Sequence, residues 1–265
     1  YNYGQSRRMI FGDFDIQHDS DTGSTTATLS GRVTWEQILQ SNTLLGYFVG
    51  LEYADSQIDG SFEGDQTRIG LNFGGYAVQR VAEHLYADGY LSMGLGDSDL
   101  DISNGTLDLQ SNYGSQTITA GAALSGLYAY EQYEFRPELA INYGRTELGN
   151  IGFTGTAYGI TDDTLSLDAG SVTVTNLTFR PEILFAVDGG TVAQSRTVMS
   201  FAPRLICEQT SSTLRADTDD CGGGAEIGFE AQSEDGLSSI NFRIAVDEIG
   251  NTRRSTGNLG VELRF

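Results

Sequence analysis

Apolar and polar residues alternate with a period of two over segments of ten or more residues. The clearest segment runs from Tyr133 to Tyr143, where Tyr, Phe, Pro, Leu, Ile and Tyr occupy the odd positions. The even positions between them carry Glu, Arg, Glu, Ala and Asn. Because successive side chains of a β-strand point to opposite faces, this segment predicts a strand with one apolar and one polar face.

The same alternation recurs along the whole chain of 265 residues and predicts about twelve strands. No segment of ten or more residues predicts an amphipathic helix. The expected strands lie near 8–18, 25–36, 43–54, 66–77, 84–95, 114–128, 132–144, 172–187, 197–207, 222–232, 238–248 and 255–265. No Pro-rich or Ser-rich linker divides the chain, so we expect one all-β domain over residues 1–265. Residues 1–7 would be the remnant of an upstream linker or a free N-terminus.

The connections between the expected strands alternate in length. The short ones lie near 37–42, 78–83, 129–131, 188–196 and 233–237. The mostly longer ones lie near 19–24, 55–65, 96–113, 145–171, 208–221 and 249–254. In an antiparallel up-and-down barrel, this alternation places the short turns and both chain ends at one rim and the long loops at the other.

Three features favour a single 12-stranded transmembrane β-barrel over a soluble β-sandwich. Strands of ten or more residues match the roughly 9–11 that a tilted strand needs to cross a bilayer, whereas soluble strands usually have about 5–6. Tyr and Phe lie near strand ends on the apolar face, like an interfacial aromatic girdle. Charged side chains on the opposite face are tolerable in a wet lumen but costly in a dry core.

We expect these charged residues to face the lumen. They are Arg32, Glu52, Arg68, Arg136, Glu138, Arg180, Glu182, Arg204, Glu226, Glu230, Arg243, Glu262 and Arg264. They would form an ion-pair ladder that stiffens the wall and fills a narrow pore, or a transverse field that selects solutes. Since Arg136 and Arg180 lie on neighbouring expected strands, we expect direct Arg–Glu contacts there.

The three prolines occupy similar places. Pro137, Pro181 and Pro203 each follow a Phe by two residues on the apolar face. Proline lacks the backbone donor of a strand ladder and is normally confined to strand ends, edges or bulges. Either the three mark a local irregularity in one sector of the wall, or their similarity is a coincidence.

Charge and cysteine content exclude several functions. Thirty-six acidic residues against fifteen basic ones, all of them Arg, give a net charge of −21. Nucleic-acid binding needs a basic face, so we expect no nucleic-acid partner. Cys207 and Cys221 flank the connection 208–220 and predict a disulfide in an oxidising compartment, in preference to free thiols or a metal site.

Neither catalysis nor a bound cofactor is expected. The sequence has two histidines, and no Gly-x-Ser-x-Gly motif accompanies them. The Asp97-Ser98-Asp99-Leu100-Asp101 segment resembles the start of a calcium loop, but the required Gly and the downstream Glu are missing. The acidic loops therefore predict a solvated, self-repelling surface, with divalent-cation binding as the alternative.

The chain ends on an alternating segment whose apolar residues are Leu259, Val261, Leu263 and Phe265. This segment resembles the C-terminal signal of bacterial outer-membrane β-barrels, which the barrel assembly machinery recognises. Together with the twelve expected strands, it makes the chain similar to an autotransporter translocator domain. The resemblance extends over nearly the whole chain and is most apparent in 133–143 and 175–181.

The resemblance implies an outer-membrane barrel of a Gram-negative-type bacterium that anchors and helps to export an N-terminal passenger. Its termini would be periplasmic and its long loops extracellular. Its partners would be outer-membrane lipid, lipopolysaccharide, the barrel assembly machinery and the passenger. The alternative is a stand-alone channel or structural barrel without a passenger, and a soluble all-β binding domain is a further, more distant one.

Overall fold

The chain folds as long β-strands in a computed structural model that describes residues 6–20, 22–40, 42–188, 190–213, 216–235 and 237–264. Among these residues, no helix is long and apolar enough to cross a membrane. The strands are β1 (Ser6–Asp19), β2 (Thr25–Gln40), β3 (Thr43–Ile58), β4 (Glu63–Ala82), β5 (Leu85–Ser103), β6 (Leu107–Gly126), β7 (Tyr128–Ala129), β8 (Tyr133–Leu148), β9 (Ile151–Ala157), β10 (Ile160–Leu167), β11 (Gly170–Ala186), β12 (Thr197–Ser212), β13 (Thr218–Gln232), β14 (Ser238–Ile249) and β15 (Thr252–Arg264).

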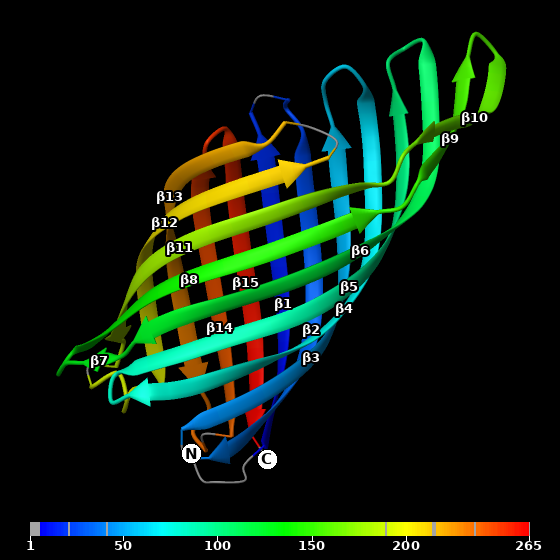
Figure 1. Cartoon of the computed structure of the whole chain (residues 1–265). Coiled ribbons are helices and arrows are strands. Elements are labelled where there is room, and N and C mark those ends of the chain that lie inside the picture. Colours follow the sequence, from blue (N-terminus) through cyan, green and yellow to red (C-terminus); the bar gives the residue numbers. More distant parts are fainter. Residues whose placement is uncertain are drawn as a thin grey trace.

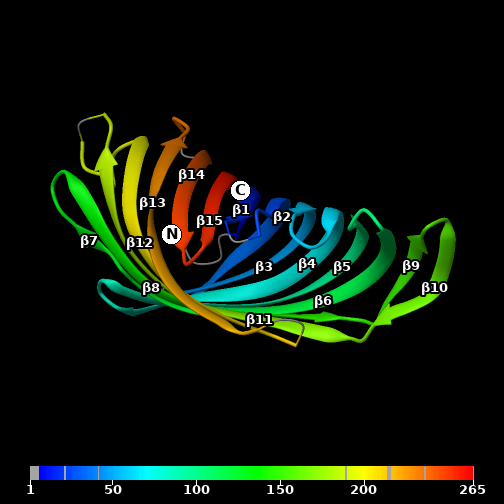
Figure 2. The same cartoon turned by 90° about the horizontal axis from the view of Figure 1, so that it is seen from above.

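Twelve of these strands form a closed antiparallel ring (Figures 1 and 2). Each strand from β1 to β6 pairs with the next, β6 pairs with β8, and β8 pairs with β11. The sequence of neighbours continues from β11 to β15, and β15 pairs with β1 to close the ring. The predicted all-β, 12-stranded barrel is therefore confirmed.

The outer face of the ring is apolar and the inner face is polar. Along β3, for example, Leu45, Tyr47, Val49, Leu51 and Tyr53 all have large exposed fractions, up to 63% for Leu51. The residues between them are less exposed and belong to the inner face. Exposed apolar side chains at alternate positions recur around the ring, which is the arrangement that a barrel surrounded by lipid requires.

The expected long loops are mostly strand, which corrects the sequence-based boundaries. The turn between β5 and β6 spans only 104–106, although a loop was expected over 96–113. In the same way, β3 and β4 extend into the loop expected over 55–65, and β12 and β13 extend into the loop expected over 208–221. Where both faces of a strand meet water, hydrophobic alternation ends but backbone pairing continues. Alternation therefore marked the apolar band of each strand and not its full length.

The expected loop 145–171 contains a hairpin that the sequence analysis did not predict. Strand β9 pairs with β10, and it also continues the edge of β6 at Leu107 to Gln110, beyond the residues that pair with β8. The turn between β9 and β10 has positive φ at Tyr158 (52°) and Gly159 (77°). Two consecutive residues of positive φ are typical of a tight type I′ hairpin turn.

The first and last strands meet at one rim of the barrel. The start of β1 and the end of β15 lie at the rim opposite the β9–β10 hairpin (Figure 1). Thirteen residue pairs join these two strands, from Arg7 opposite Arg264 to Asp19 opposite Thr252. The ring is therefore closed by the two ends of the chain over nearly the full length of both strands.

Candidate functional site

The polar lumen is the candidate functional site. Two cavities of about 720 Å³ and 650 Å³ lie against the inner wall, and both are lined by Phe11, Asp13 and Arg32. The first extends along β1 to β6 and reaches Thr146 of β8, and the second extends along β1, β2 and β12 to β15. The inner wall thus leaves space between charged and polar side chains.

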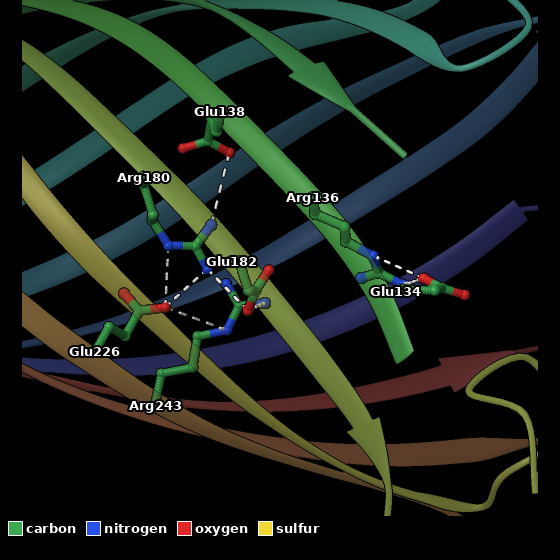
Figure 3. A network of polar contacts seen from close by, with 7 residues as sticks. All are labelled: Glu134, Arg136, Glu138, Arg180, Glu182, Glu226 and Arg243. Carbon is green, nitrogen blue, oxygen red and sulfur yellow. Dashed lines mark hydrogen bonds and ion pairs between the residues drawn. The ribbon is translucent and has the colours of Figure 1, made fainter. Parts of the chain in front are cut away.

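A cluster of ion pairs centred on Arg180 lies on the inner face of β8 to β14 (Figure 3). Arg180 Nη2 lies 2.8 Å from Glu226 Oε1 and 3.0 Å from Glu182 Oε1. Its Nη1 lies 3.8 Å from Glu138 Oε2. The exposed fractions of these side chains are small, 11% for Arg180 and 3% for Glu182. Since unpaired charges are costly when buried, the guanidinium and its carboxylates need one another.

Arg243 joins the same cluster from β14. It lies 3.9 Å from Glu182 Oε1 and 4.0 Å from Glu226 Oε1. The contact with Glu182, like that of Arg180 with Glu226, passes over β12, which contributes Ala202 to the inner face at this level. The contact with Glu226 joins the adjacent strands β13 and β14. Ala202 is only 1% exposed, because the charged side chains cover it. A small residue on β12 therefore leaves room for ion pairs that connect β11 with β13 and β14.

A second group of charges lies farther from the rim that carries the chain ends. Arg204 Nη1 lies 3.0 Å from Asp247 Oδ2, and the Asp247 side chain is fully buried. Neither Asp247 oxygen has a hydrogen-bond partner among the described residues. The contact is therefore an ion pair without the directional geometry of a hydrogen bond. Arg254 lies 3.5 Å from Glu208 and 4.0 Å from Asp15. These contacts connect β12 with β14 and β15, and β15 with β1.

The inner face of β1 to β6 is filled by tyrosines as well as by ion pairs. Tyr76 donates a hydrogen bond to Glu36, which also pairs with Arg7. Arg68 Nη1 lies 3.0 Å from Glu52 Oε1 on the adjacent strand. The contacts of Arg7 with Glu36 and of Arg68 with Glu52 join strands that also pair through their backbones, whereas the hydrogen bond of Tyr76 with Glu36 passes over β3.

Two tyrosine rings lie over glycines of neighbouring strands. A Cβ on Gly46 would overlap the ring of Tyr76, and a Cβ on Gly121 would overlap the ring of Tyr90. The Tyr90 hydroxyl donates to Asn142 Oδ1 at 3.0 Å. Glycine is required at these positions because the ring occupies the space that a side chain would take.

The predicted luminal charges fall into three groups. Ion pairs include Glu52, Arg68, Arg136, Glu138, Arg180, Glu182, Arg204, Glu226, Arg243 and Glu262. Arg32 and Glu230 line cavities without an ion pair among the described residues, and Arg32 Cζ instead lies 4.9 Å from the centroid of the Phe11 ring. The side chain of Arg264 lies outside the described residues.

The expected Arg–Glu contacts between the strands of Arg136 and Arg180 are present only in part. Arg180 contacts Glu138 across the strand boundary, but Arg136 pairs with Glu134 on its own strand, at 2.7 Å. Glu134 is 6% exposed and Arg136 lies near the rim. Register places Arg136 opposite Glu182, yet Glu182 is already occupied by Arg180.

The sequence analysis missed several luminal charges, namely Arg7, Asp13, Asp15, Glu36, Asp88, Glu134, Glu208, Asp247 and Arg254. Arg7 and Arg254 lie one residue before the expected strands 8–18 and 255–265. Asp247 belongs to the polar face of an expected strand but was not identified as a pairing residue. Asp13, Asp15, Glu36, Asp88 and Glu134 likewise lie inside expected strands, so the full polar face of each strand would have found them. Glu208 lies one residue after the expected strand 197–207.

The disulfide between Cys207 and Cys221 is present, but it does not lie at the strand ends. The two residues are directly opposite each other on β12 and β13, with a Cα–Cα distance of 4.0 Å. Three further pairs, ending with Thr210 opposite Thr218, lie between the disulfide and the turn. The bond therefore reinforces a hairpin that is already paired.

The residues of the calcium-like segment belong to β5 and not to a loop. Asp99 accepts a hydrogen bond from Asn112 at 2.8 Å, and Asp101 accepts one from Gln110 at 3.1 Å. In the part of the chain that the structure describes, no group of three or more His, Cys, Asp or Glu side chains could hold a metal ion. An extended strand cannot wrap its alternate carboxylates around a cation.

The apolar residues of the C-terminal segment lie on the outer face of β15. The exposed fractions of Leu259, Val261 and Leu263 are 47%, 36% and 39%. The fourth residue of the expected assembly signal, Phe265, lies outside the described residues. The three described members thus present one apolar row at the rim of the chain ends.

Comparisons with known proteins agree with this barrel. The family model described as the autotransporter beta-domain matches residues 36–239. None of the curated proteins compared with the chain matches it significantly. The β domain of the Bordetella autotransporter BrkA is similar, with 16% identity and a TM-score of 0.76, covering 98% of this chain and 100% of that chain.

Two further solved structures have the same fold. The translocator domain of NalP from Neisseria meningitidis has 12% identity and a TM-score of 0.74, covering 98% of this chain and 89% of that chain. The transport unit of AIDA-I from Escherichia coli has 15% identity and a TM-score of 0.62, with coverages of 98% and 90%. Since the family model spans well over half of the chain, the chain belongs to the autotransporter β-domain family, the translocators that export a passenger across the bacterial outer membrane.

Proposed function

We propose that the barrel crosses the outer membrane with the ends of β1 and β15 at the periplasmic rim and the β9–β10 hairpin outside. A passenger joined ahead of β1 then travels through the lumen. The observation that carries this proposal is a closed ring whose outer face is apolar and whose inner face is polar and contains cavities. Membership of the family already makes the chain a transport domain, which is neither an enzyme nor a channel without a passenger.

The chemistry of the two rims supports this orientation. Beyond the apolar band, β5 presents Asp97, Asp99 and Asp101 on its outer face at the rim of the hairpin. These carboxylates repel one another unless they face water or cations, and lipopolysaccharide headgroups are bridged by divalent cations. The acidic rim therefore suits the outer surface, where it contacts lipopolysaccharide.

The luminal charges serve as ion pairs that stiffen the wall, and not as a field across the pore. Acidic and basic side chains alternate on both halves of the ring instead of separating to opposite sides. Almost every described luminal Arg lies within 4.0 Å of a carboxylate, and the exception is Arg32. Paired charges create little net field at a distance.

The row of Leu259, Val261 and Leu263 acts with Phe265 as the assembly signal. Its described members are exposed on the outer face of the last strand, where a barrel assembly machine can bind them before the ring closes. The function needs no nucleic acid and no cofactor, because translocation by this barrel depends on its wall and its lumen alone.

The orientation and the export are tested together by surface display. A reporter domain is joined ahead of Tyr1 behind a signal peptide, and a protease site is placed in the turn at Tyr158 and Gly159. We expect added protease to cut both the reporter and the hairpin in intact cells. A matched barrel carries the site instead at Glu83 and His84, in the turn between β4 and β5, and there the cut should require a permeabilised outer membrane.

Two results would contradict the proposal. Cleavage at Glu83 and His84 in intact cells, with the hairpin protected, would invert the orientation. A reporter that stays inaccessible although the hairpin is cut from outside would leave the orientation intact and remove the export route.

A further inference from the structure

The three prolines form a row across β8, β11 and β12. Pro137 is directly opposite Pro181 in the pairing of β8 with β11. The flanking pairs of β11 and β12 are Phe179 with Leu205 and Ile183 with Phe201, which place Pro181 opposite Pro203. Between these flanking pairs, the backbone pairing of β11 with β12 is interrupted.

The interruption follows from the hydrogen-bond phase of the two strands. Val187 N–H donates to Thr197 O at 3.0 Å, and Thr213 N–H donates to Ser171 O at 3.0 Å. Opposite residues alternate between bonded and non-bonded pairs in an antiparallel ladder, so the odd residues of β11 occupy bonded positions. Pro181 and Pro203 therefore share a position that requires two N–H donors, and neither has one. Two successive backbone bonds are missing together.

This gap lies in the middle of the apolar outer band. Along β11, the exposed apolar residues Leu177, Phe179 and Phe185 lie on either side of Pro181, and Val187 follows directly after the strand. Lipid offers no water to replace a missing backbone bond, so a wall that faces lipid normally keeps its ladder complete. The boundary of β11 and β12 is thus locally weaker than the uninterrupted boundary of β3 and β4.

The Arg180 cluster lies directly behind the gap on the luminal side (Figure 3). Arg180 and Glu182 are the neighbours of Pro181 in the chain, and their side chains point inward. The contact of Arg180 with Glu226 connects β11 with β13, and the contact of Arg243 with Glu182 connects β14 with β11. Both contacts cross the gap, so ion pairs connect the two sides where backbone bonds do not.

We propose that the boundary between β11 and β12 at Pro181 and Pro203 is a seam at which the wall opens laterally, and that the Arg180 cluster is its luminal latch. The seam is distinct from the junction of β1 with β15, where thirteen pairs are continuous. Opening there widens the lumen toward the bilayer without separating the chain ends. This inference concerns the wall itself and does not depend on the export route.

Amide hydrogen exchange tests the seam in barrels folded in lipid nanodiscs, because exchange reports local opening. Peptides covering 177–187 and 199–207 are compared with peptides covering 45–53 and 69–77, which face lipid at a continuous ladder. We expect exchange at the seam to be about tenfold faster or more. Equal rates in the wild-type barrel would overturn the proposal.

Two variants separate the prolines from the latch. The double variant Pro181→Val/Pro203→Val restores both donors and should slow exchange at the seam to the rate of the β3–β4 peptides. Arg180→Met should accelerate exchange at the seam, whereas the matched Arg68→Met, which removes the contact with Glu52, should leave the seam unchanged. Unchanged exchange in the double variant would show that the missing N–H donors of the prolines do not cause the opening.

A second latch variant covers the case in which Arg180→Met does not insert. Glu226→Gln keeps the shape of the side chain and weakens only the cross-strand ion pair, and it should also accelerate exchange at 177–187. If neither latch variant accelerates exchange beyond Arg68→Met, the latch is disproved even where the seam itself is confirmed.

Discussion

The two halves of the wall differ in how their strands are held together and in what fills the lumen. In the β3–β6 sector, backbone pairing is continuous through the apolar band and is irregular only between Arg80 and Ala82 at the end of β4, and the lumen is filled by Tyr76 and Tyr90 lying over glycines. In the β8–β14 sector, a pair of prolines interrupts the ladder and a charged cluster fills the lumen. The comparison teaches that side-chain bridges replace backbone bonds only where the bridging charges are buried and shared.

The largest expected effect comes from removing the centre of the charged cluster. Arg180→Met leaves Glu182 and Glu226 buried without their main partner, and breaking a buried ion pair costs about 3–5 kcal/mol. Arg68→Met in the other sector should cost only about 0.5–1 kcal/mol, because that pair is more than a quarter exposed and is partly screened. Guanidinium unfolding, followed by the fluorescence of the single Trp35, measures both free energies.

A matched change tests whether the cost comes from the unpaired acids. Combining Arg180→Met with Glu182→Gln should recover part of the lost stability, because one buried carboxylate is neutralised. If Arg180→Met and Arg68→Met destabilise equally, the two sectors do not differ in the way proposed.

Reduction of the Cys207–Cys221 disulfide should have the next largest effect. The bond closes a segment with a sequence separation of 14, for which chain entropy predicts about 3 kcal/mol of stabilisation. It fixes β12 to β13 on the side away from the seam, so its loss should destabilise the β8–β14 sector and leave the β3–β6 sector unchanged. Unfolding with and without reductant measures the total, and Cys207→Ser/Cys221→Ser removes the effect of the reductant itself.

Filling the glycine positions tests the other sector. Gly121→Ala places a Cβ into the ring of Tyr90, and overpacking of this kind costs about 1–3 kcal/mol. Tyr90→Ala in the same chain should remove the overlap, so the double variant should be more stable than the sum of the two single changes predicts. A double-mutant cycle measured by guanidinium unfolding gives this coupling, and a coupling of zero would show that the ring simply turns aside.

The smallest effect is expected at the rim turn between β11 and β12. Hydrogen bonds from the Ser195 side chain and from the Arg196 backbone N–H, the latter at 3.2 Å, hold the pKa of Asp188 below its ordinary value of 3.8. The folded state therefore binds fewer protons, and the stabilisation is present above pH 3.8 and is lost as the pH falls through the lowered pKa. Asp188→Asn should lower the unfolding midpoint slightly at neutral pH and have no effect in strong acid.

The ring and its two faces could be predicted from the sequence because lipid imposes one strict rule. Within the bilayer, outward-facing apolar residues must alternate with inward-facing polar ones. Segments such as Tyr133 to Tyr143 therefore identify both the strand and its outward face. The rule ends at the edge of the bilayer. The β9–β10 hairpin, whose Ile160 is 74% exposed, does not separate lipid from water. Its sequence therefore lacks the apolar–polar alternation, and the segment was expected to be a loop.

The pairing of the luminal charges could not be predicted because it depends on register. Alternation placed Arg180, Glu182 and Glu226 on the inner face, but only the relative shift of the strands decides which of them meet. Because the register was unknown, the sequence could not decide whether the three prolines mark a local irregularity in the wall or are similar only by coincidence. Register places Pro181 opposite Pro203 and so decides for the irregularity.

The pairing of β1 with β15 also limits how the barrel is made. Asn258 donates a hydrogen bond to Asp13 over a sequence separation of 245, so this contact belongs to the least local part of the fold. Bringing distant residues together costs loop-closure entropy before any contact compensates for it, which slows folding. The last strand must therefore have been synthesised and delivered before the first can find its second neighbour, and until then β1 remains an open edge in need of protection.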